Sequence, residues 1–277
     1  MTLDHVPGPD HDLASDDLLL EALRQAAAAE RLLVVCDYDG TLAPLVLDPA
    51  QAHPQPGALE AVRELNALPR THVTLLSGRS RRDLMRLTGL GERADTTDVR
   101  LVGSHGAEHG PVLDPSEPLA RQARLVTAAL RELVRGVPGV LVETKPYGAA
   151  VHVRGASEAD GERVIEQVLD GPAKLPGVRV LHGKSVVELS VVDADKGEAL
   201  RRLARECDAD VAVAIGDDET DEWMFAVLSE GSVSVKVGPG ETGARFRVPG
   251  VADVVSLVRT LTHERATYLA TDDDPTR

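Results

Sequence analysis

Apolar, β-branched runs alternate with helix-like patterns along most of this chain, and this alternation limits the folds open to it. Runs rich in Val, Leu and Ile occur at 31–37, 72–77, 100–104, 211–216 and 232–237. Helical spacing of apolar residues follows at 57–68, 80–87, 196–207, from 218 onward and at 251–269. Buried strands that alternate with helices form a parallel sheet with helices on both faces. The sequence therefore predicts an α/β core, a Rossmann-like doubly wound parallel sheet.

The middle of the chain has a different pattern. A long amphipathic helix is expected at 119–135, and then two strands, a helix and two strands at 140–145, 149–154, 158–169, 178–183 and 187–192. This order is typical of a small antiparallel α+β unit. We therefore expect a core at 18–108 and 188–270, an inserted α+β cap at 109–187, and disordered ends at 1–17 and 271–277.

Composition restricts the partners of the chain. Of its 277 residues 43% are hydrophobic and only 2% are aromatic, so the core must be built from Leu, Val and Ala. A net charge of -15 would repel duplex nucleic acid and anionic membranes, and aromatics for stacking single strands are few. We expect a monomer with no nucleic-acid and no membrane partner. An anionic substrate would need a local positive site made of Lys, Arg or a metal ion.

The cysteines and the N-terminal residues indicate the compartment. Cys36 and Cys207 lie in apolar stretches without zinc-binding spacing, so we expect two buried thiols in a reducing compartment. The first 17 residues lack the basic start and apolar centre of a signal peptide, and no apolar run is long enough to span a membrane. These features predict a cytoplasmic protein.

The strongest chemical signal is DYDGT at 37–41, directly after the first predicted strand. The carboxyl ends of strands in an open α/β sheet border the reactive crevice, so Asp37 and Asp39 should project into it. An Asp can attack phosphorus to form an aspartyl-phosphate, and a second Asp can protonate the leaving oxygen and later activate water. Gly40 lets backbone N–H groups approach phosphoryl oxygens. The alternative is that the first Asp only caps a helix.

A second signal, GDDETDE at 216–222, follows another apolar strand. So many acids in one turn repel each other and need a cation, and hard oxygen ligands suit Mg²⁺. The alternative is an acidic helix start, which the helix dipole favours. That alternative explains one or two of the acids, and it leaves the others without a reason.

Two weaker signals stand at other strand-to-helix junctions. Ser77, before Gly78 and Arg79, can hold a phosphate oxygen at a helix start, although Ser before Gly is also an ordinary turn. Lys196 opens another helix and could supply positive charge, although a Lys beside an Asp is commonly a solvated pair. Together the four junctions provide a nucleophile, an acid/base, a metal site and a cation, which phosphoryl transfer needs.

These motifs resemble those of the haloacid dehalogenase superfamily of phosphatases. DYDGT is similar to its first motif, Ser77 to its second, Lys196 to its third and Asp217-Asp218 to its fourth, and the insertion resembles its larger α+β caps. Within the superfamily the chain resembles the trehalose-6-phosphate phosphatase family. The segments that carry this likeness are GDDETDE (216–222), SHGAE (104–108), ETK (143–145) and HGKSVVE (182–188).

The resemblance implies an enzyme that hydrolyses trehalose 6-phosphate through an aspartyl-phosphate, with Mg²⁺ as cofactor and a small-molecule sugar phosphate as partner. The catalytic residues that it implies are Asp37 as nucleophile, Asp39 as acid/base, Thr41, Ser77 and Lys196. Mg²⁺ would be held by Asp37, the backbone carbonyl of Asp39 and Asp217, with support from Asp218 and Asp221. The implied substrate-binding residues are Arg79, His105, Gly106, Glu143, Lys145, Arg154, Lys184 and Glu188.

Several alternatives stay open at this point. The cap charges could be solvated surface, and His105 and His152 could be structural. Motif spacing does not separate trehalose 6-phosphate from sucrose 6-phosphate or a mannosyl phosphate, nor a phosphatase from a phosphomutase. A non-catalytic sugar-phosphate sensor is disfavoured because the catalytic acids and Lys196 are present. No glycosyltransferase domain precedes the motifs, so we expect the chain not to be a bifunctional synthase–phosphatase.

Overall fold

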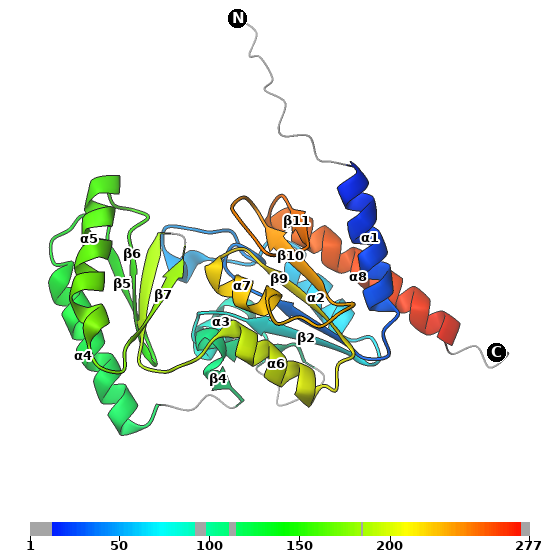
Figure 1. Ribbon diagram of the computed structural model, residues 1–277, viewed down its shortest axis with the longest axis horizontal. Coiled ribbons are helices and arrows are strands. Elements are labelled where there is room, and N and C mark those ends of the chain that lie inside the picture. The colour runs from blue at the N-terminus through cyan, green and yellow to red at the C-terminus, as the bar shows by residue number, and fades with distance from the viewer. Residues whose placement is uncertain (1–12, 92–97, 111–114, 184, 273–277) are drawn as a thin grey trace, which may run out of the picture.

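The core is a seven-stranded sheet with strand order β11-β10-β9-β1-β2-β3-β4 (Figure 1). The structure is a computed structural model, which describes residues 13–91, 98–110, 115–183 and 185–272. The strands are β1 (Leu32–Cys36), β2 (Thr71–Leu76), β3 (Arg100–Gly103), β4 (Glu108–His109), β9 (Val211–Gly216), β10 (Val233–Val237) and β11 (Phe246–Val248). Neighbours pair in parallel except β3 and β4. Strands β2 to β4 follow on one side of β1, and β9 to β11 follow on its other side. The direction in which strands are added therefore reverses at β1, and such a switch point opens a crevice at the carboxyl ends of the strands.

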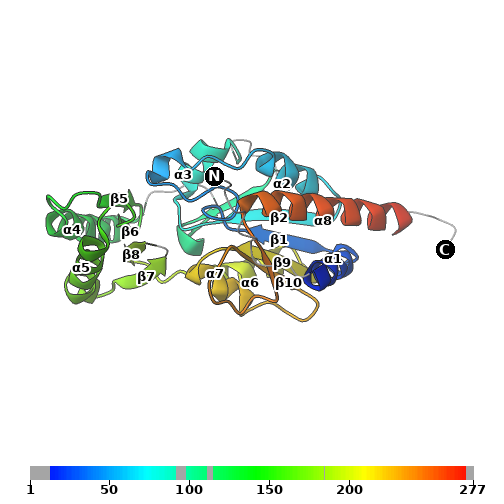
Figure 2. The ribbon, with the colours of Figure 1, turned by 90° about the horizontal axis from the view of Figure 1, so that it is seen from above.

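Helices cover both faces of this sheet, as Figure 2 shows. One layer contains α1 (Leu13–Ala27), α2 (Ala58–Asn66), α3 (Arg81–Thr88) and α8 (Val251–Asp272), and the other contains α6 (Lys196–Glu206) and α7 (Glu219–Phe225). Side chains of a strand point alternately to its two faces. Thus Leu32 and Val34 pack in the first layer, whereas Leu33 and Val35 pack in the second. Both faces of β1 are apolar for this reason, and the predicted doubly wound core is confirmed.

A second, antiparallel sheet has strand order β5-β6-β8-β7. Its strands are β5 (Leu141–Lys145), β6 (Gly148–His152), β7 (Arg179–Gly183) and β8 (Val186–Ser190), and its helices are α4 (Glu117–Leu133) and α5 (Glu158–Asp170). Short 3-10 turns occupy Pro49–Gln51, Ser104–Gly106 and Pro172–Lys174. Alternate residues such as Val151 and Leu189 pack against the helices, so the intervening residues, including Glu188, face away from them. Figure 1 shows this uncovered face turned toward the core.

The structure differs from the predicted boundaries at three places. Helix α1 begins at Leu13, so residues 13–17 are helical and the prediction of disorder there is wrong. The helix is held because its Ala22, Leu23 and Ala26 are buried in the first layer. Helix α8 continues to Asp272, into the predicted tail. Strand β8 crosses the core–cap boundary predicted at residue 187. Residues 1–12 and 273–277 lie outside the described residues.

The cysteines and the helices bear on the compartment expected from the sequence. Cys36 is buried and Cys207 is partly buried, and both are free thiols. Burial raises the pKa of the Cys36 thiol to about 12. Among the described residues, none of the helices combines the length and apolar character that crossing a membrane requires.

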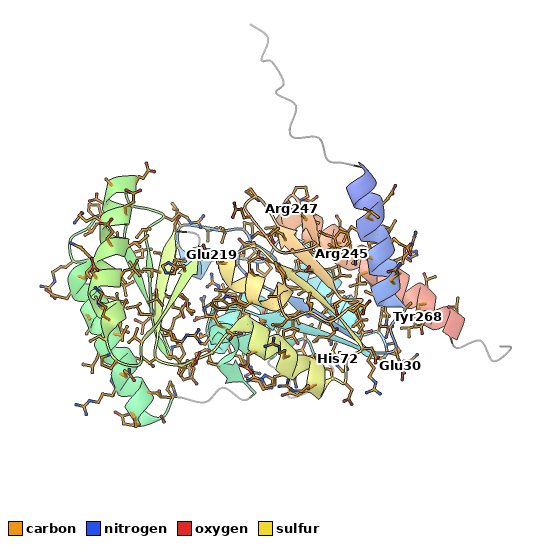
Figure 3. The ribbon with its side chains drawn as sticks, in the orientation of Figure 1. Glu30, His72, Glu219, Arg245, Arg247 and Tyr268 are labelled. Carbon is orange, nitrogen blue, oxygen red and sulfur yellow. The ribbon has the colours of Figure 1, made fainter. Side chains whose placement is uncertain are left out.

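Arg265 on α8 holds the end of the core remote from the cap. Its guanidinium is fully buried and donates to the carbonyls of Ala27 (2.8 Å), Glu30 (3.0 Å) and Arg70 (3.0 Å), and to Thr71 Oγ1 (3.1 Å). These groups come from the end of α1, the loop that follows it, and the start of β2 with the residue before it. Figure 3 labels Glu30 and Tyr268, which lie beside this network.

We expect Arg265→Met to lower the free energy of unfolding by about 3–5 kcal/mol, because one buried and several partly buried carbonyls would lose their donor. The melting temperature should fall by roughly 6–20 °C for a domain of this size. Arg259→Met is the matched control, since Arg259 is an exposed arginine of the same helix. Thermal denaturation of both variants checks this, and equal melting temperatures would contradict the role given to Arg265.

Candidate active site

A buried lysine joins two carboxylates at the carboxyl end of the sheet. Asp37 directly follows β1, and its N–H donates to the carbonyl of Ile215 on β9 (2.9 Å). Lys196 is the first residue of α6, where Asp195 caps the helix by accepting from the N–H of Glu198 (2.7 Å). Lys196 Nζ lies 2.9 Å from Asp37 Oδ1 and 2.7 Å from Asp221 Oδ1, and the lysine is 1% exposed. Lys196 is therefore not the solvated surface pair that the sequence left open.

The acidic segment after β9 folds around the start of α7. Asp218 caps this helix, and its Oδ1 accepts from the N–H of Thr220 (2.9 Å). Asp221 Oδ2 accepts from the N–H groups of Asp217 (2.8 Å) and Asp218 (3.0 Å). Lys236 of β10 donates to the carbonyl of Asp217. The helix-start interpretation is thus correct for Asp218 and Asp221, and these bonds also fix Asp217 beside the site.

Three of the carboxylates could share a cation. Asp37, Asp217 and Asp221 each offer an oxygen, and these oxygens all lie within 4.8 Å of one another. Gly40 makes room for this cluster: its φ of +80° suits glycine, and a Cβ there would lie 2.3 Å from the Asp217 carboxylate. Since Asp221 already accepts three hydrogen bonds, Asp37 and Asp217 are the better candidate ligands.

Electrostatics show the need for positive charge at this point. Burial raises the pKa of Asp37 well above its ordinary value; Lys196 opposes this shift, and Asp221, Asp218 and Asp217 add to it. Burial alone would lower the pKa of Lys196, but Asp221 and Asp37 raise it, so the ammonium stays protonated. One ammonium group faces several carboxylates, and a divalent cation held by oxygens would offset the remaining negative charge.

The second Asp of DYDGT is paired with an arginine. Arg79 Nε and Nη2 donate to the two oxygens of Asp39 at 2.6 and 2.7 Å, and the guanidinium stacks 5.6 Å from the Tyr38 ring centroid. Ser77 is buried, and its Oγ accepts from the N–H of Arg79 (3.2 Å). Thr41 Oγ1 is buried without a hydrogen-bond partner.

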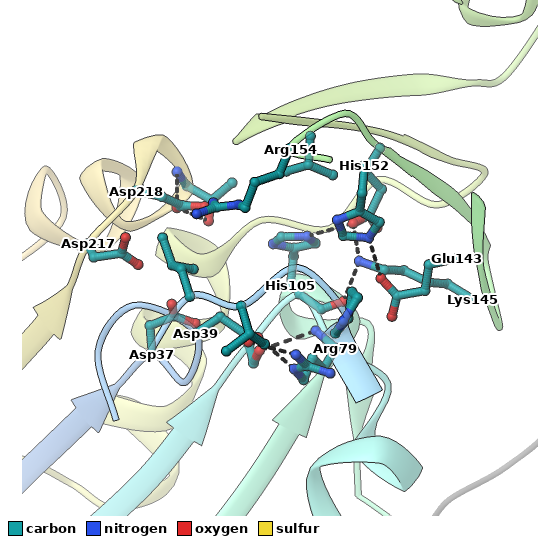
Figure 4. Close-up of a pocket in the computed structure, with 18 of the residues that line it drawn as sticks. Asp37, Asp39, Arg79, His105, Glu143, Lys145, His152, Arg154, Asp217 and Asp218 are labelled. Carbon is teal, nitrogen blue, oxygen red and sulfur yellow. Dashed lines mark hydrogen bonds and ion pairs between the residues drawn. The ribbon is translucent and has the colours of Figure 1, made fainter. Parts of the chain in front are cut away.

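Charged residues of the uncovered cap face meet the core directly (Figure 4). Lys145 Nζ donates to the carbonyl of Gly78 (2.9 Å) and also to Glu188. His105 Nε2, from the core, lies 3.3 Å from Glu188 Oε2. Burial would raise the pKa of Glu188, but Lys145 and His105 lower it to about 2. These cap charges are therefore not the solvated surface that the sequence left open.

The remaining cap pair shows the same pattern. His152 Nε2 lies 2.8 Å from Glu143 Oε2. Burial would raise the pKa of Glu143, but the bond to His152 and the charge of Lys145 lower it below its ordinary value. Both side chains face the core, as does Arg154, which Figure 4 shows near Asp218.

A cavity of about 140 Å³ is lined by residues of both the cap and the core. The predicted residues that line it are Asp37, Asp39, Ser77, Arg79, His105, Glu143, Lys145, Arg154, Glu188, Lys196, Asp217 and Asp218. Thr41 and Asp221 lie behind this lining, and Lys184 lies outside the described residues. Further lining residues that sequence reasoning did not select are Leu45, Val46, Pro49, Gly78, His152, Val186 and Thr220.

Gly106 is not among the residues that line this cavity. Its carbonyl accepts from Arg202 Nη2 (2.8 Å), and a Cβ at Gly106 would lie 2.7 Å from the Cβ of Ala199 on α6. The glycine therefore permits close packing of its loop on α6, and the substrate contact implied for it by the family resemblance stays a prediction.

Comparison with known proteins supports one family. The trehalose-phosphatase family model matches residues 35–249. The chain is 36% identical over 85% of its length to a bifunctional trehalose-6-phosphate synthase/phosphatase of Thermoproteus tenax, and 33% identical over 78% to a trehalose-phosphate phosphatase of Mycobacterium marinum. It spans only 32% and 56% of those two relatives.

A solved structure shows the same fold. The C-terminal domain of the trehalose-6-phosphate phosphatase of C. albicans superposes with a TM-score of 0.74 at 26% identity, and the match covers 89% of this chain and 96% of that domain. The family match runs from the end of β1 through the cap and the acidic segment to β11. This chain therefore belongs to the trehalose-phosphatase family.

Proposed function

We propose that this chain hydrolyses trehalose 6-phosphate to trehalose and inorganic phosphate through an aspartyl-phosphate on Asp37. The observation that carries the proposal is the buried Asp37–Lys196 pair beside Asp217, which lies beneath a cap face rich in charged groups. The family membership and the names of the relatives support the same reaction.

The chemistry follows from the positions of the side chains. An Asp37 oxygen attacks phosphorus, the bond from phosphorus to the sugar oxygen breaks, and Asp39 gives a proton to that leaving oxygen, which becomes the sugar hydroxyl. Asp39 then takes a proton from a water that attacks the phosphorus, which releases phosphate and restores Asp37. Lys196 and Ser77 would hold phosphoryl oxygens in both steps. Both oxygens of Asp39 accept from Arg79, so this ion pair must open before Asp39 can carry a proton.

Mg²⁺ is the cation that we propose for the acidic cluster. Asp37, Asp217 and the backbone carbonyl of Asp39 would hold it, and Asp218 and Asp221 would keep Asp217 in place. The ion would supply positive charge next to the phosphoryl oxygens as negative charge moves onto the leaving group. The hard oxygen donors present in the cluster fit this choice.

The identity of the sugar phosphate is tested by comparing substrates. Sucrose 6-phosphate, a mannosyl phosphate and binding without turnover are the competing possibilities, and we propose in addition that the protein is monomeric and cytoplasmic. Phosphate release should be measured on a panel of sugar phosphates with Mg²⁺ present. We expect kcat/KM to be highest for trehalose 6-phosphate; a higher value for another sugar phosphate, or no release at all, would contradict the proposal.

The cap should select the sugar. Lys145→Ala and Glu188→Ala should each lower kcat/KM on trehalose 6-phosphate at least about tenfold, because each removes a charged hydrogen-bonding partner at the cavity. Hydrolysis of a small aryl phosphate, which makes no sugar contacts, should change little. Glu162→Ala, an exposed acid on α5, is the control. Parallel losses on both substrates would show that these residues support the core or the fold.

A further inference from the structure

The cavity has an apolar part that the phosphoryl chemistry does not use. Among the described residues that line it, the nonpolar side chains are Leu45, Val46, Pro49 and Val186. The first three belong to one segment between β1 and α2, and Val186 starts β8 on the uncovered face of the cap. Apolar side chains therefore border the cavity from the core and from the cap. We call Leu45, Val46 and Pro49 the apolar lip.

The lip leaves apolar surface in water. Leu45 is 38% exposed and Val46 is 37% exposed, although each borders a cavity otherwise lined mostly by charged groups. Covering such surface is favourable by roughly 25 cal/mol per Å². A ligand with an apolar face would therefore gain affinity by lying against the lip.

Hydrogen bonds fix both ends of the segment that carries the lip. On one side the N–H of Gly40 donates to the carbonyl of Ala43 (2.7 Å), and the N–H of Ala43 donates to the carbonyl of Tyr38 (2.8 Å). On the other side Asp48 accepts from the N–H of Ala50 (3.0 Å), and the Tyr38 hydroxyl donates to the carbonyl of Ala52 (2.7 Å). The lip is thus tied to the DYDGT turn and has a set position beside Asp39.

Aromatic side chains do not provide this surface. Proteins commonly bind the C–H face of a sugar ring with an aromatic side chain, which is large and apolar. The chain has three Tyr, two Phe and one Trp, all within the described ranges, and none of them lines the cavity. In this cavity the apolar surface that could cover the C–H face of a sugar ring is aliphatic.

We propose that the apolar lip, opposed by Val186, packs against the C–H face of a pyranose ring of the substrate, while the cap charges bind its hydroxyl groups. This inference rests on the proposed function, because it requires a phosphorylated sugar in the cavity. A pyranose fits the lining since it has hydroxyl groups at its edge and C–H groups on its faces. The lip is thus a specificity surface, and it takes no part in bond breaking.

Replacing the lip tests this assignment. The double variant Leu45→Ser/Val46→Ser should raise KM for trehalose 6-phosphate by about tenfold with a smaller change in kcat. Acetyl phosphate, which has no ring, should be hydrolysed at the wild-type rate. The variant Leu45→Met/Val46→Ile keeps the apolar surface and should recover most of the affinity that the serine variant loses. Leu47→Ser is the matched control, because Leu47 is 64% exposed in the same segment and does not line the cavity.

The outcomes separate this inference from the proposed function. A KM for the double variant equal to that of Leu47→Ser overturns the lip assignment, and so does a parallel loss on acetyl phosphate, which would show damage to the core. If the wild type prefers another sugar phosphate, the proposed substrate fails and the same variants are compared on that compound. If no sugar phosphate is hydrolysed while acetyl phosphate is, both proposals fail.

Discussion

Asp37→Asn is expected to lower kcat at least about 10³-fold while the protein stays folded. The amide has nearly the shape of the carboxylate, so the position after β1 can be filled in the same way. It is a far weaker nucleophile toward phosphorus and a poorer ligand for a cation. The buried Lys196 would keep Asp221 as its carboxylate partner, since Asp221 Oδ1 lies 2.7 Å from Nζ. Steady-state phosphate release measures the loss, and thermal unfolding shows whether the fold is retained.

The control for this variant is Glu60→Gln, which makes the same chemical change at an exposed position on α2. It should match the wild type in rate and in melting temperature. If Asp37→Asn keeps a substantial fraction of the wild-type kcat, Asp37 is not the covalent nucleophile. If Asp37→Asn is inactive because it is unfolded, its melting temperature shows this. Asp37→Glu is then used in its place, since it keeps the carboxylate but moves it by one methylene.

Removal of divalent ions should reduce activity to background, and added Mg²⁺ should restore it. The carboxylates around Asp37 repel each other, and a phosphorylated substrate brings more negative charge into the same place. Ca²⁺ should not substitute, because it takes more ligands at longer distances and would favour binding of Asp37 through both oxygens. Full activity in Ca²⁺, or after chelation, would contradict the metal assignment.

A second readout of the same site does not depend on turnover. Mg²⁺ that binds only the folded protein should raise the melting temperature in proportion to the logarithm of its concentration. In Asp217→Asn, the Mg²⁺ concentration needed for the same rise in melting temperature should be at least about tenfold higher, which is the loss expected for one charged ligand. Glu219→Gln, at the adjacent helix start but outside the cavity lining, is the matched control.

Much of the fold followed from local sequence patterns. Strands such as Val211–Gly216 are continuous apolar runs between helices, and this pattern has few structural solutions. The strands β4 and β11 were not predicted, because segments of two or three residues have no periodicity and are defined by their pairing. The start of helix α1, residues 13–17, was assigned to a disordered end because the helix packs against α8, which lies at the other end of the chain.

The site was predictable where an acidic residue directly follows a predicted strand. Asp37 and Asp217 directly follow the neighbouring core strands β1 and β9, so topology brings them together, whereas Lys196 opens α6 after β8 of the cap sheet. Long-range pairings were not visible in the sequence: nothing local to Arg79 indicates that it binds both oxygens of Asp39. The lip residues Leu45 and Val46 belong to an irregular segment, where apolar residues give no sign of which cavity they border. The packing role of Gly106 depends on α6, which is distant in the sequence.

The most direct test of the account is a competition between substrates. Wild-type protein with Mg²⁺ is given equal concentrations of trehalose 6-phosphate and sucrose 6-phosphate, and the released sugars are separated and quantified. The ratio of initial rates equals the ratio of the two kcat/KM values. We predict that released trehalose exceeds released sucrose by at least about tenfold, which is the discrimination that one well-placed polar contact can provide. Equal release of both sugars, or an excess of sucrose, would contradict the assignment of this site to trehalose 6-phosphate.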